Sequence, residues 1–207
     1  MANRIAGIIF DIGGVLVALD GVPSLAALLG VEAQHDALHE MWMASPSVVA
    51  HETGQIGPNE FAVGVVADLK LPVTAEWFLE DFSSWLKGPL PGAAELLDEI
   101  PTQYRLTALS NMSAVHWDAI VATGLTRRFD QIFVSHEIGY LKPAREAFDA
   151  ALSGMQLRPS EVLFLDDGQR NVDAARAFGM KADLVRGPDE ARAVLGRFGV
   201  IPSSDGA

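Results

Sequence analysis

The stretch IIFDIGGVL, residues 8–16, determines the fold class that we predict for this chain. Its apolar run ends abruptly at Asp11, and a Gly-Gly turn follows. Such a run is typical of a buried strand, here residues 5–10. Open α/β sheets bind ligands at the carboxyl ends of their strands, where Asp11 would serve as nucleophile or metal ligand. The alternative is that Asp11 caps the next helix, because Asp is a favoured N-cap residue.

The composition indicates a globular protein without cysteine chemistry. The 207 residues are 49% hydrophobic and 20% charged, which is enough to build a core without disulfide bonds. The absence of cysteine excludes disulfides, thiolate metal ligands and a cysteine nucleophile. No targeting or membrane-spanning pattern is evident, so we expect a cytoplasmic protein without membrane contact.

The charge balance limits the kinds of partner that the surface can bind. Acidic residues outnumber basic ones by 27 to 15, and the formal net charge is -12. Such a surface repels nucleic acid and also repels anionic substrates at long range. A phosphate site would therefore have to be built locally, from a metal ion, one well-placed cation and backbone amides. The oligomeric state, monomer or homodimer, is left open.

Strand and helix patterns alternate through the second half of the chain. Strand-like runs occupy residues 5–10, 105–109, 131–135, 162–165 and 182–185. Helical patterns lie at 92–100, 114–123, 143–153, 171–178 and 188–198. This alternation predicts an α/β fold, a Rossmann-like parallel sheet with helices on both faces.

Residues 20–88 have a different pattern, with helical segments at 24–29, 32–43, 58–69 and 74–86 and no convincing strand. Pro46 and residues 53–58 interrupt them. Because these helices carry their own apolar faces, we predict an inserted helical-bundle cap rather than one irregular crossover. The predicted core domain comprises 1–19 and 89–200, the cap domain 20–88, and a frayed tail 201–207.

Polar residues follow the later strands at the same predicted edge as Asp11. They are Ser110 and Asn111 after the second strand, Asp166 and Asp167 after the fourth, and Lys142 at the predicted start of a helix. A hydroxyl beside free turn amides can hold a phosphate oxygen. Three clustered carboxylates need a cation among them, and an all-oxygen site suits Mg²⁺. Taken singly, these residues could also be helix caps or a surface charge.

In this combination the chain resembles the haloacid dehalogenase superfamily, chiefly its capped, Mg²⁺-dependent phosphatase branch. The resemblance covers nearly the whole chain. It implies that Asp11 is the nucleophile, Ser110 the phosphate-binding hydroxyl, Lys142 the conserved lysine and Asp166-Asp167 the acidic metal pair. The segment HETGQI, residues 51–56, also resembles the cap of a group that includes a glucose-1-phosphate phosphatase and the phosphatase domain of soluble epoxide hydrolase.

The resemblance implies hydrolysis through an aspartyl-phosphate on Asp11. The implied Mg²⁺ ligands are Asp11, the backbone carbonyl of Gly13 and Asp167. Asp166 would be either a further ligand or the residue that positions Lys142. The Gly14 backbone would approach the phosphate.

We expect the cap to set substrate specificity. His51 and Glu52 are the predicted cap-side substrate contacts, with Ser110, Asn111 and Gly14 on the core side. Trp42, Met43 and Trp85 could also face the opening, although packing within the cap is the favoured interpretation for the two tryptophans.

Position 13 departs from the family pattern. Most phosphatases of the superfamily carry a second Asp there, which protonates the leaving group, whereas this chain has Gly13. Loss of a general acid typically costs on the order of 10²–10⁴ in rate for a poor leaving group. His51 or Glu52 could replace it, although a surface position is the favoured interpretation for His51.

Three functions remain open from the sequence. The favoured one is hydrolysis of small phosphorylated metabolites, with sugar phosphates among the candidates. The second is 2-haloacid dehalogenation through an ester on Asp11. This reaction needs no metal ion, so it would give the Asp166-Asp167 pair little purpose. The third is a weak or non-catalytic protein that binds a phosphorylated ligand or a partner, which Gly13 motivates.

Overall fold

A parallel five-stranded sheet forms the centre of the computed structural model, which describes residues 4–202. The strands lie in the order β5-β4-β1-β6-β7, and every neighbouring pair is parallel. Their bounds are β1 Gly7–Phe10, β4 Arg105–Ser110, β5 Gln131–Val134, β6 Val162–Asp166 and β7 Lys181–Leu184. The predicted parallel sheet is confirmed, with strand ends that differ from prediction by one or two residues.

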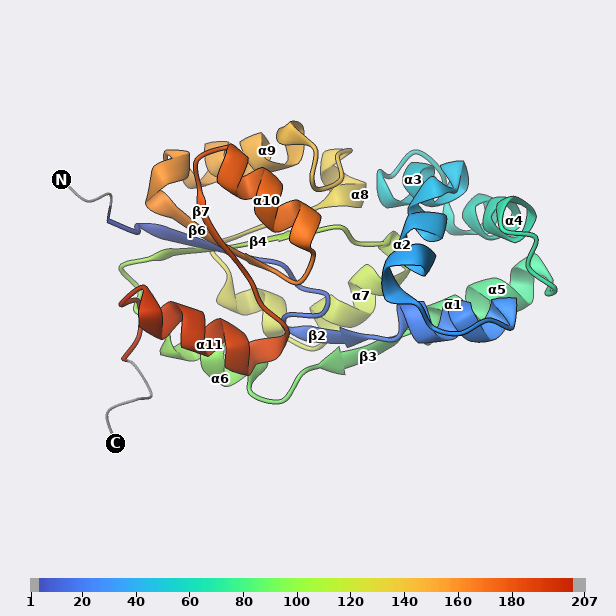
Figure 1. Ribbon diagram of the computed structural model, residues 1–207, viewed down its shortest axis with the longest axis horizontal. Coiled ribbons are helices and arrows are strands. Elements are labelled where there is room, and N and C mark those ends of the chain that lie inside the picture. The colour runs from blue at the N-terminus through green and yellow to red at the C-terminus, as the bar shows by residue number, and fades with distance from the viewer. Residues whose placement is uncertain (1–3, 203–207) are drawn as a thin grey trace.

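Helices cover both faces of this sheet (Figure 1). On one face lie α6 Ala93–Glu99, α7 Ala114–Ala122 and α11 Gly187–Arg197, and on the other α9 Arg145–Met155 and α10 Gln169–Ala177. Short helices fill the connections: η1 Leu125–Arg128, α8 Ser135–Ile138 and η2 Pro159–Glu161. The sheet therefore has no exposed face, as an all-parallel sheet requires.

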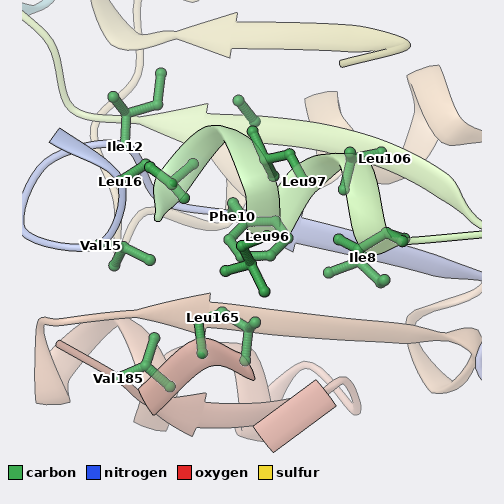
Figure 2. Packing of buried hydrophobic residues seen from close by; sticks show 14 of the residues in the cluster. Ile8, Phe10, Ile12, Val15, Leu16, Leu96, Leu97, Leu106, Leu165 and Val185 are labelled. Atoms are coloured by element: carbon green, nitrogen blue, oxygen red, sulfur yellow. The ribbon is translucent and has the colours of Figure 1, made fainter. Parts of the chain in front are cut away.

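Strand β1 supplies apolar side chains to both layers. Ile8 and Phe10 point into the cluster beneath α6 and α11, whereas Ile9 belongs to the cluster beneath α9 and α10. Figure 2 shows the first cluster closing around Phe10, with Leu96 from α6 and Leu165 from β6 nearby. Each such buried side chain contributes roughly 1.5–3 kcal/mol. The packing fixes the end of β1, and with it the position of Asp11.

Five helices form a separate hydrophobic cluster at one end of the molecule (Figure 1). They are α1 Gly21–Leu29, α2 His35–Ala44, α3 Pro46–Glu52, α4 Pro58–Asp68 and α5 Ala75–Ser83. Their shared core includes Phe61, Phe78 and Phe82, which are almost fully buried. The helical character predicted for this region is confirmed, whereas the division into domains at 19/20 and 88/89 stays a prediction.

We predicted that Pro46 interrupts the helical segments, but it is the first residue of helix α3. Ser45 ends α2 and also caps α3, accepting a hydrogen bond from Val48 N at 3.3 Å. Pro46 occupies the first turn of α3, where its missing N–H costs nothing. Proline therefore begins a helix here rather than interrupting one.

A two-stranded antiparallel ribbon was also missed. It pairs β2 Val17–Leu19 with β3 Leu86–Pro89, at the two connections between the sheet and the helical cluster. Helix α5 consequently ends at Ser83, before the predicted end at residue 86. Each strand is too short to show alternation, and the pairing joins segments far apart in sequence.

Two further expectations were wrong in detail. Lys142 does not begin a helix, because α9 starts at Arg145. Pro143 disfavours the helical conformation for the residue before it, which explains the difference. Ile201, the expected start of the frayed tail, is buried in the core, and residues 203–207 lie outside the described range. None of the described helices has the length and apolar character needed to cross a membrane.

Candidate functional site

Asp11 follows the last residue of β1, at the carboxyl edge of the sheet. Its backbone N–H donates to Leu165 O at 2.8 Å, which continues the strand pairing for one residue. The carboxylate is buried, and its Oδ1 accepts a hydrogen bond from Ile12 N at 2.7 Å. No hydrogen bond to Oδ2 is found within residues 4–202, so this oxygen is available for attack or for a ligand.

Lys142 joins Asp11 to Asp166. Its Nζ lies 2.9 Å from Asp11 Oδ1 and 2.6 Å from Asp166 Oδ2, and all three side chains are buried. Burial disfavours the ammonium, but the two carboxylates outweigh it and raise the pKa of Lys142. The lysine is therefore a fixed positive charge beside Asp11.

The backbone of Lys142 is held by Asn111. Asn111 Oδ1 accepts a hydrogen bond from Lys142 N at 2.7 Å, and Asn111 Nδ2 donates to Lys142 O at 3.0 Å. Both ends of the amide are thus engaged. This differs from the predicted substrate contact, because the side chain positions the lysine instead.

Ser110 ends β4 beside this group. Its hydroxyl is buried and has no hydrogen-bond partner among the residues that the structure describes. A buried hydroxyl without a partner is unfavourable unless a ligand completes it. A phosphate oxygen would do so, as predicted for this residue.

Asp166 and Asp167 have different surroundings. Asp166 Oδ1 accepts hydrogen bonds from Gly168 N at 2.8 Å and Asn171 Nδ2 at 2.9 Å, while Oδ2 faces Lys142. Both oxygens of this fully buried carboxylate are therefore engaged. Asp167 is half-buried, and its side chain makes no comparable set of contacts among the described residues.

The three carboxylates form a cluster whose chemistry fits a divalent cation. Asp11, Asp166 and Asp167 each offer one oxygen within 4.8 Å of the others. Burial, followed by the neighbouring carboxylates, raises the pKa of Asp11 to about 7 although Lys142 opposes this shift. Burial likewise raises the pKa of Asp167 to about 6. A bound cation would offset this repulsion, and the donors are all oxygen, as Mg²⁺ prefers.

Gly14 provides space for this cluster. It adopts φ +68°, a conformation that side chains disfavour, and a Cβ there would overlap the Asp167 carboxylate. Only glycine therefore allows the turn after Asp11 to pass this close to Asp167.

On the cap side, His51 is buried, which corrects the surface interpretation. Its Nε2 lies 2.8 Å from Ser113 Oγ, in the loop after β4, and its Nδ1 lies 3.1 Å from Ile56 O. Burial lowers the pKa of His51, so the ring is neutral near pH 7. Both nitrogens are engaged, and His51 joins the cap to the core.

Glu52 is the next residue and is half-buried. Burial raises the pKa of its carboxyl to about 7, and the indole of Trp42 donates to it at 3.3 Å. Trp42 stacks on Phe82 with centroids 5.8 Å apart and also meets Trp85 at 5.7 Å. The packing interpretation of both tryptophans is confirmed.

Sequence reasoning missed two residues that support the site. Asn171 bonds to Asp166, and Ser113 bonds to His51 while also capping α7 through Val115 N. A polar residue after a strand or in a first helical turn is a weak signal, because helix caps have the same pattern.

The chain also matches proteins that are already known. A family model described as haloacid dehalogenase-like hydrolase matches residues 5–179. The chain belongs to this family. This haloacid dehalogenase-like hydrolase is 26% identical over 188 residues to a D-ribitol-5-phosphate phosphatase of Bacteroides thetaiotaomicron, a match that covers 86% of the chain and 90% of that protein.

Two further similarities were found. Protein CbbY of Rhodobacter capsulatus is 29% identical over 133 residues, and that match covers 62% of the chain and 57% of the length of CbbY. A HAD family enzyme of Bacteroides thetaiotaomicron, crystallised with magnesium and inorganic phosphate, superimposes with a TM-score of 0.70. It is 24% identical, and the match covers 88% of this hydrolase and 94% of that enzyme. At this identity the superposition establishes the shared fold.

Proposed function

We propose that this hydrolase removes phosphate from small phosphorylated metabolites through an aspartyl-phosphate on Asp11. The observation that carries the proposal is the group at one sheet edge: an anchored nucleophile, the Lys142 ammonium 2.9 Å from it, and the unpartnered Ser110 hydroxyl. These supply what phosphoryl transfer needs, an in-line nucleophile and groups that bind the phosphate oxygens.

In the first step, Asp11 Oδ2 attacks phosphorus while the bond from phosphorus to the leaving oxygen breaks. Two like charges 4 Å apart repel each other by about 4 kcal/mol at an effective dielectric of about 20, and the Lys142 ammonium opposes this repulsion. Ser110 donates to a phosphate oxygen. In the second step, water attacks phosphorus, the bond from phosphorus to Asp11 Oδ2 breaks, and the carboxylate is regenerated. The proton that the water loses returns to the group that protonated the leaving oxygen in the first step.

Asp11, the Gly13 backbone carbonyl and Asp167 would hold Mg²⁺ in this proposal. The ion supplies positive charge that neutralises the transferring phosphoryl group. Asp166 has both oxygens engaged by Lys142, Gly168 and Asn171, so we assign it to positioning Lys142. Because Gly14 has no side chain, the space beside the Asp167 carboxylate stays open, which supports Asp167 as a Mg²⁺ ligand.

Glu52 is the proposed general acid in place of the carboxylate absent at position 13. A group that gives a proton to the leaving oxygen must hold that proton near neutral pH, and a carboxyl with a pKa of about 7 does so. His51 is less suited, because both its nitrogens already have partners. We propose that His51 orients the segment that carries Glu52.

The relatives support the substrate class. The Bacteroides relative acts on D-ribitol-5-phosphate by its name, and the solved Bacteroides enzyme holds magnesium and phosphate. We accordingly propose a small phosphate ester as substrate, no nucleic-acid or membrane partner, and a cytoplasmic location. The acidic surface, with a net charge of -12, supports the exclusion of nucleic acid.

Phosphate release across a panel of sugar phosphates, polyol phosphates, nucleotides and acyl phosphates tests the proposal. We expect turnover of at least one small ester with Mg²⁺ and its loss in EDTA. Chloride release from 2-chloropropionate without Mg²⁺ would instead support dehalogenation. Saturable phosphate binding with no turnover across the panel would support a binding protein, and either outcome rejects the phosphatase proposal.

A further inference from the structure

Arg186 lies at the carboxyl edge of the sheet, immediately beyond β7. The residues on either side of it are tied to the two acidic loops of the site. Val185 N donates to Asp166 O at 3.0 Å, and Gly187 N donates to Gly14 O at 2.9 Å. The backbone of Arg186 is therefore fixed between the loop that carries Asp167 and the turn that follows Asp11.

The Arg186 side chain is exposed, and within residues 4–202 its guanidinium has neither a hydrogen bond nor an ion pair. The nearby Glu190 carboxylate accepts a hydrogen bond from the Arg186 backbone N–H at 2.8 Å and forms no ion pair with the guanidinium among the described residues. Several other arginines of this acidic protein are in ion pairs, among them Arg170 with Glu40 and Arg192 with Glu99. A free cation at this edge is therefore notable.

The charge of Arg186 lies close to the site despite its exposure. Its two chain neighbours are hydrogen-bonded to Asp166 and Gly14, which adjoin Asp167 and Gly13 in the chain. Arg186 is thus within about a Debye length of the carboxylate cluster, although no hydrogen bond or ion pair joins them among the described residues.

An anionic substrate faces an unfavourable approach to this edge. The protein has a net charge of -12, and the site holds three carboxylates against one lysine that is already paired with two of them. A surface cation at the entrance raises the local concentration of an anion and lowers its KM. The effect weakens as salt screens the charge.

We propose that Arg186 is the residue that attracts the phosphate dianion into this acidic site and holds it there before phosphoryl transfer. The inference rests on the proposed phosphatase function and adds a binding residue from the segment that follows β7. It also implies that dianionic substrates are favoured over monoanionic ones, because the attraction scales with substrate charge.

Steady-state kinetics of Arg186→Gln test the inference. Arg127→Gln is the matched control, because Arg127 is exposed, has no ion pair among the described residues, and precedes β5 at the opposite end of the sheet. Both variants change the net charge equally. With an accepted phosphate ester and saturating Mg²⁺, we expect Arg186→Gln to raise KM roughly threefold to tenfold at about 20 mM ionic strength. The increase should shrink at about 300 mM.

Arg186→Lys keeps the charge and should retain most of the low-salt KM. An equal KM change in Arg186→Gln and Arg127→Gln would overturn the inference, since net charge alone would then explain it. A change confined to kcat or to the Mg²⁺ concentration required for activity would also overturn it.

The phosphatase function and the role of Arg186 can be rejected independently of each other. Turnover by the wild type tests the phosphatase function, whereas the ratio between variants tests Arg186. If the wild type turns over no ester, calorimetric titration of inorganic phosphate with Mg²⁺ present replaces kinetics. Weaker, less salt-sensitive binding by Arg186→Gln than by Arg127→Gln then supports the inference, and equal or undetectable binding rejects it.

Discussion

At position 13 the chain lacks a side-chain carboxylate, and Glu52 compensates from the cap in the account given above. Its carboxyl retains a proton near neutral pH because burial raises its pKa to about 7. The Trp42 indole bond restricts the side chain. A single residue from the cap would thus control how well a poor leaving group departs.

Glu52→Gln should therefore slow turnover according to the leaving group. With a sugar or polyol phosphate we expect kcat to fall on the order of 10²–10⁴, and much less with p-nitrophenyl phosphate, whose leaving group needs no proton. The acid acts when protonated, so wild-type kcat should fall as pH rises through about 7, and the variant should lack this limb. Glu60→Gln, an exposed change on α4, is the control. Equal losses with both esters would refute the assignment.

Residues at strand ends could be predicted, and residues held by distant contacts could not. Asp11, Ser110 and Asp166 follow apolar strands, so their shared edge is inferred from topology alone. The engagement of Asn111 with Lys142 and of His51 with Ser113 depends on segments 31 and 62 positions apart. No local pattern encodes such pairs.

At the scale of elements, two buried histidines join the helical cluster to the sheet region. His51 of α3 bonds to Ser113, and His116 of α7 lies 2.7 Å from Phe82 O in α5. Each ring also packs on a phenylalanine of the cluster, with centroids 4.2 Å apart for His51–Phe61 and 4.4 Å for His116–Phe82. These contacts fix α3 and α5 relative to the core.

Burial lowers the pKa of both histidines, which predicts a loss of stability in acid. The folded state binds fewer protons than the unfolded state below about pH 6.5, so the free energy of unfolding falls as pH falls through that value. Urea denaturation at several pH values measures this slope. His51→Gln and His116→Gln should each flatten it and cost about 1–3 kcal/mol at pH 7.5. A slope as steep in both variants as in the wild type would contradict the interpretation.

The elements themselves were predictable where they are long and periodic. The helices of the core and most of those in the cap were found within a few residues, because apolar spacing defines them. Helix α3 and the β2–β3 ribbon were missed for physical reasons. The sequence alone does not distinguish a proline in the first turn of a helix from a proline that interrupts one. The two short paired strands show no alternation of apolar and polar residues.

At the scale of the whole molecule, the fold gathers one site from widely separated segments. Ser110 and Asp166 end strands β4 and β6 at the carboxyl edge of the sheet. Asp11 and Arg186 follow β1 and β7, and Lys142 lies in the loop between α8 and α9. The helical cluster lies at one end of the molecule, joined through the β2–β3 ribbon and the two histidines (Figure 1). The fold class could be predicted from the alternation of strands and helices. The orientation of the helical cluster relative to the sheet could not, because contacts between residues far apart in the sequence determine it.

The most direct test of the central claim is the rate of phosphate release by Asp11→Asn, measured with Mg²⁺ on the best ester found in the panel. The asparagine keeps the shape of the side chain and removes the nucleophilic carboxylate. We predict that kcat falls by at least about 10³ while the variant remains folded by circular dichroism, because no covalent intermediate can form. Release within about tenfold of the wild-type rate would contradict Asp11 as the nucleophile.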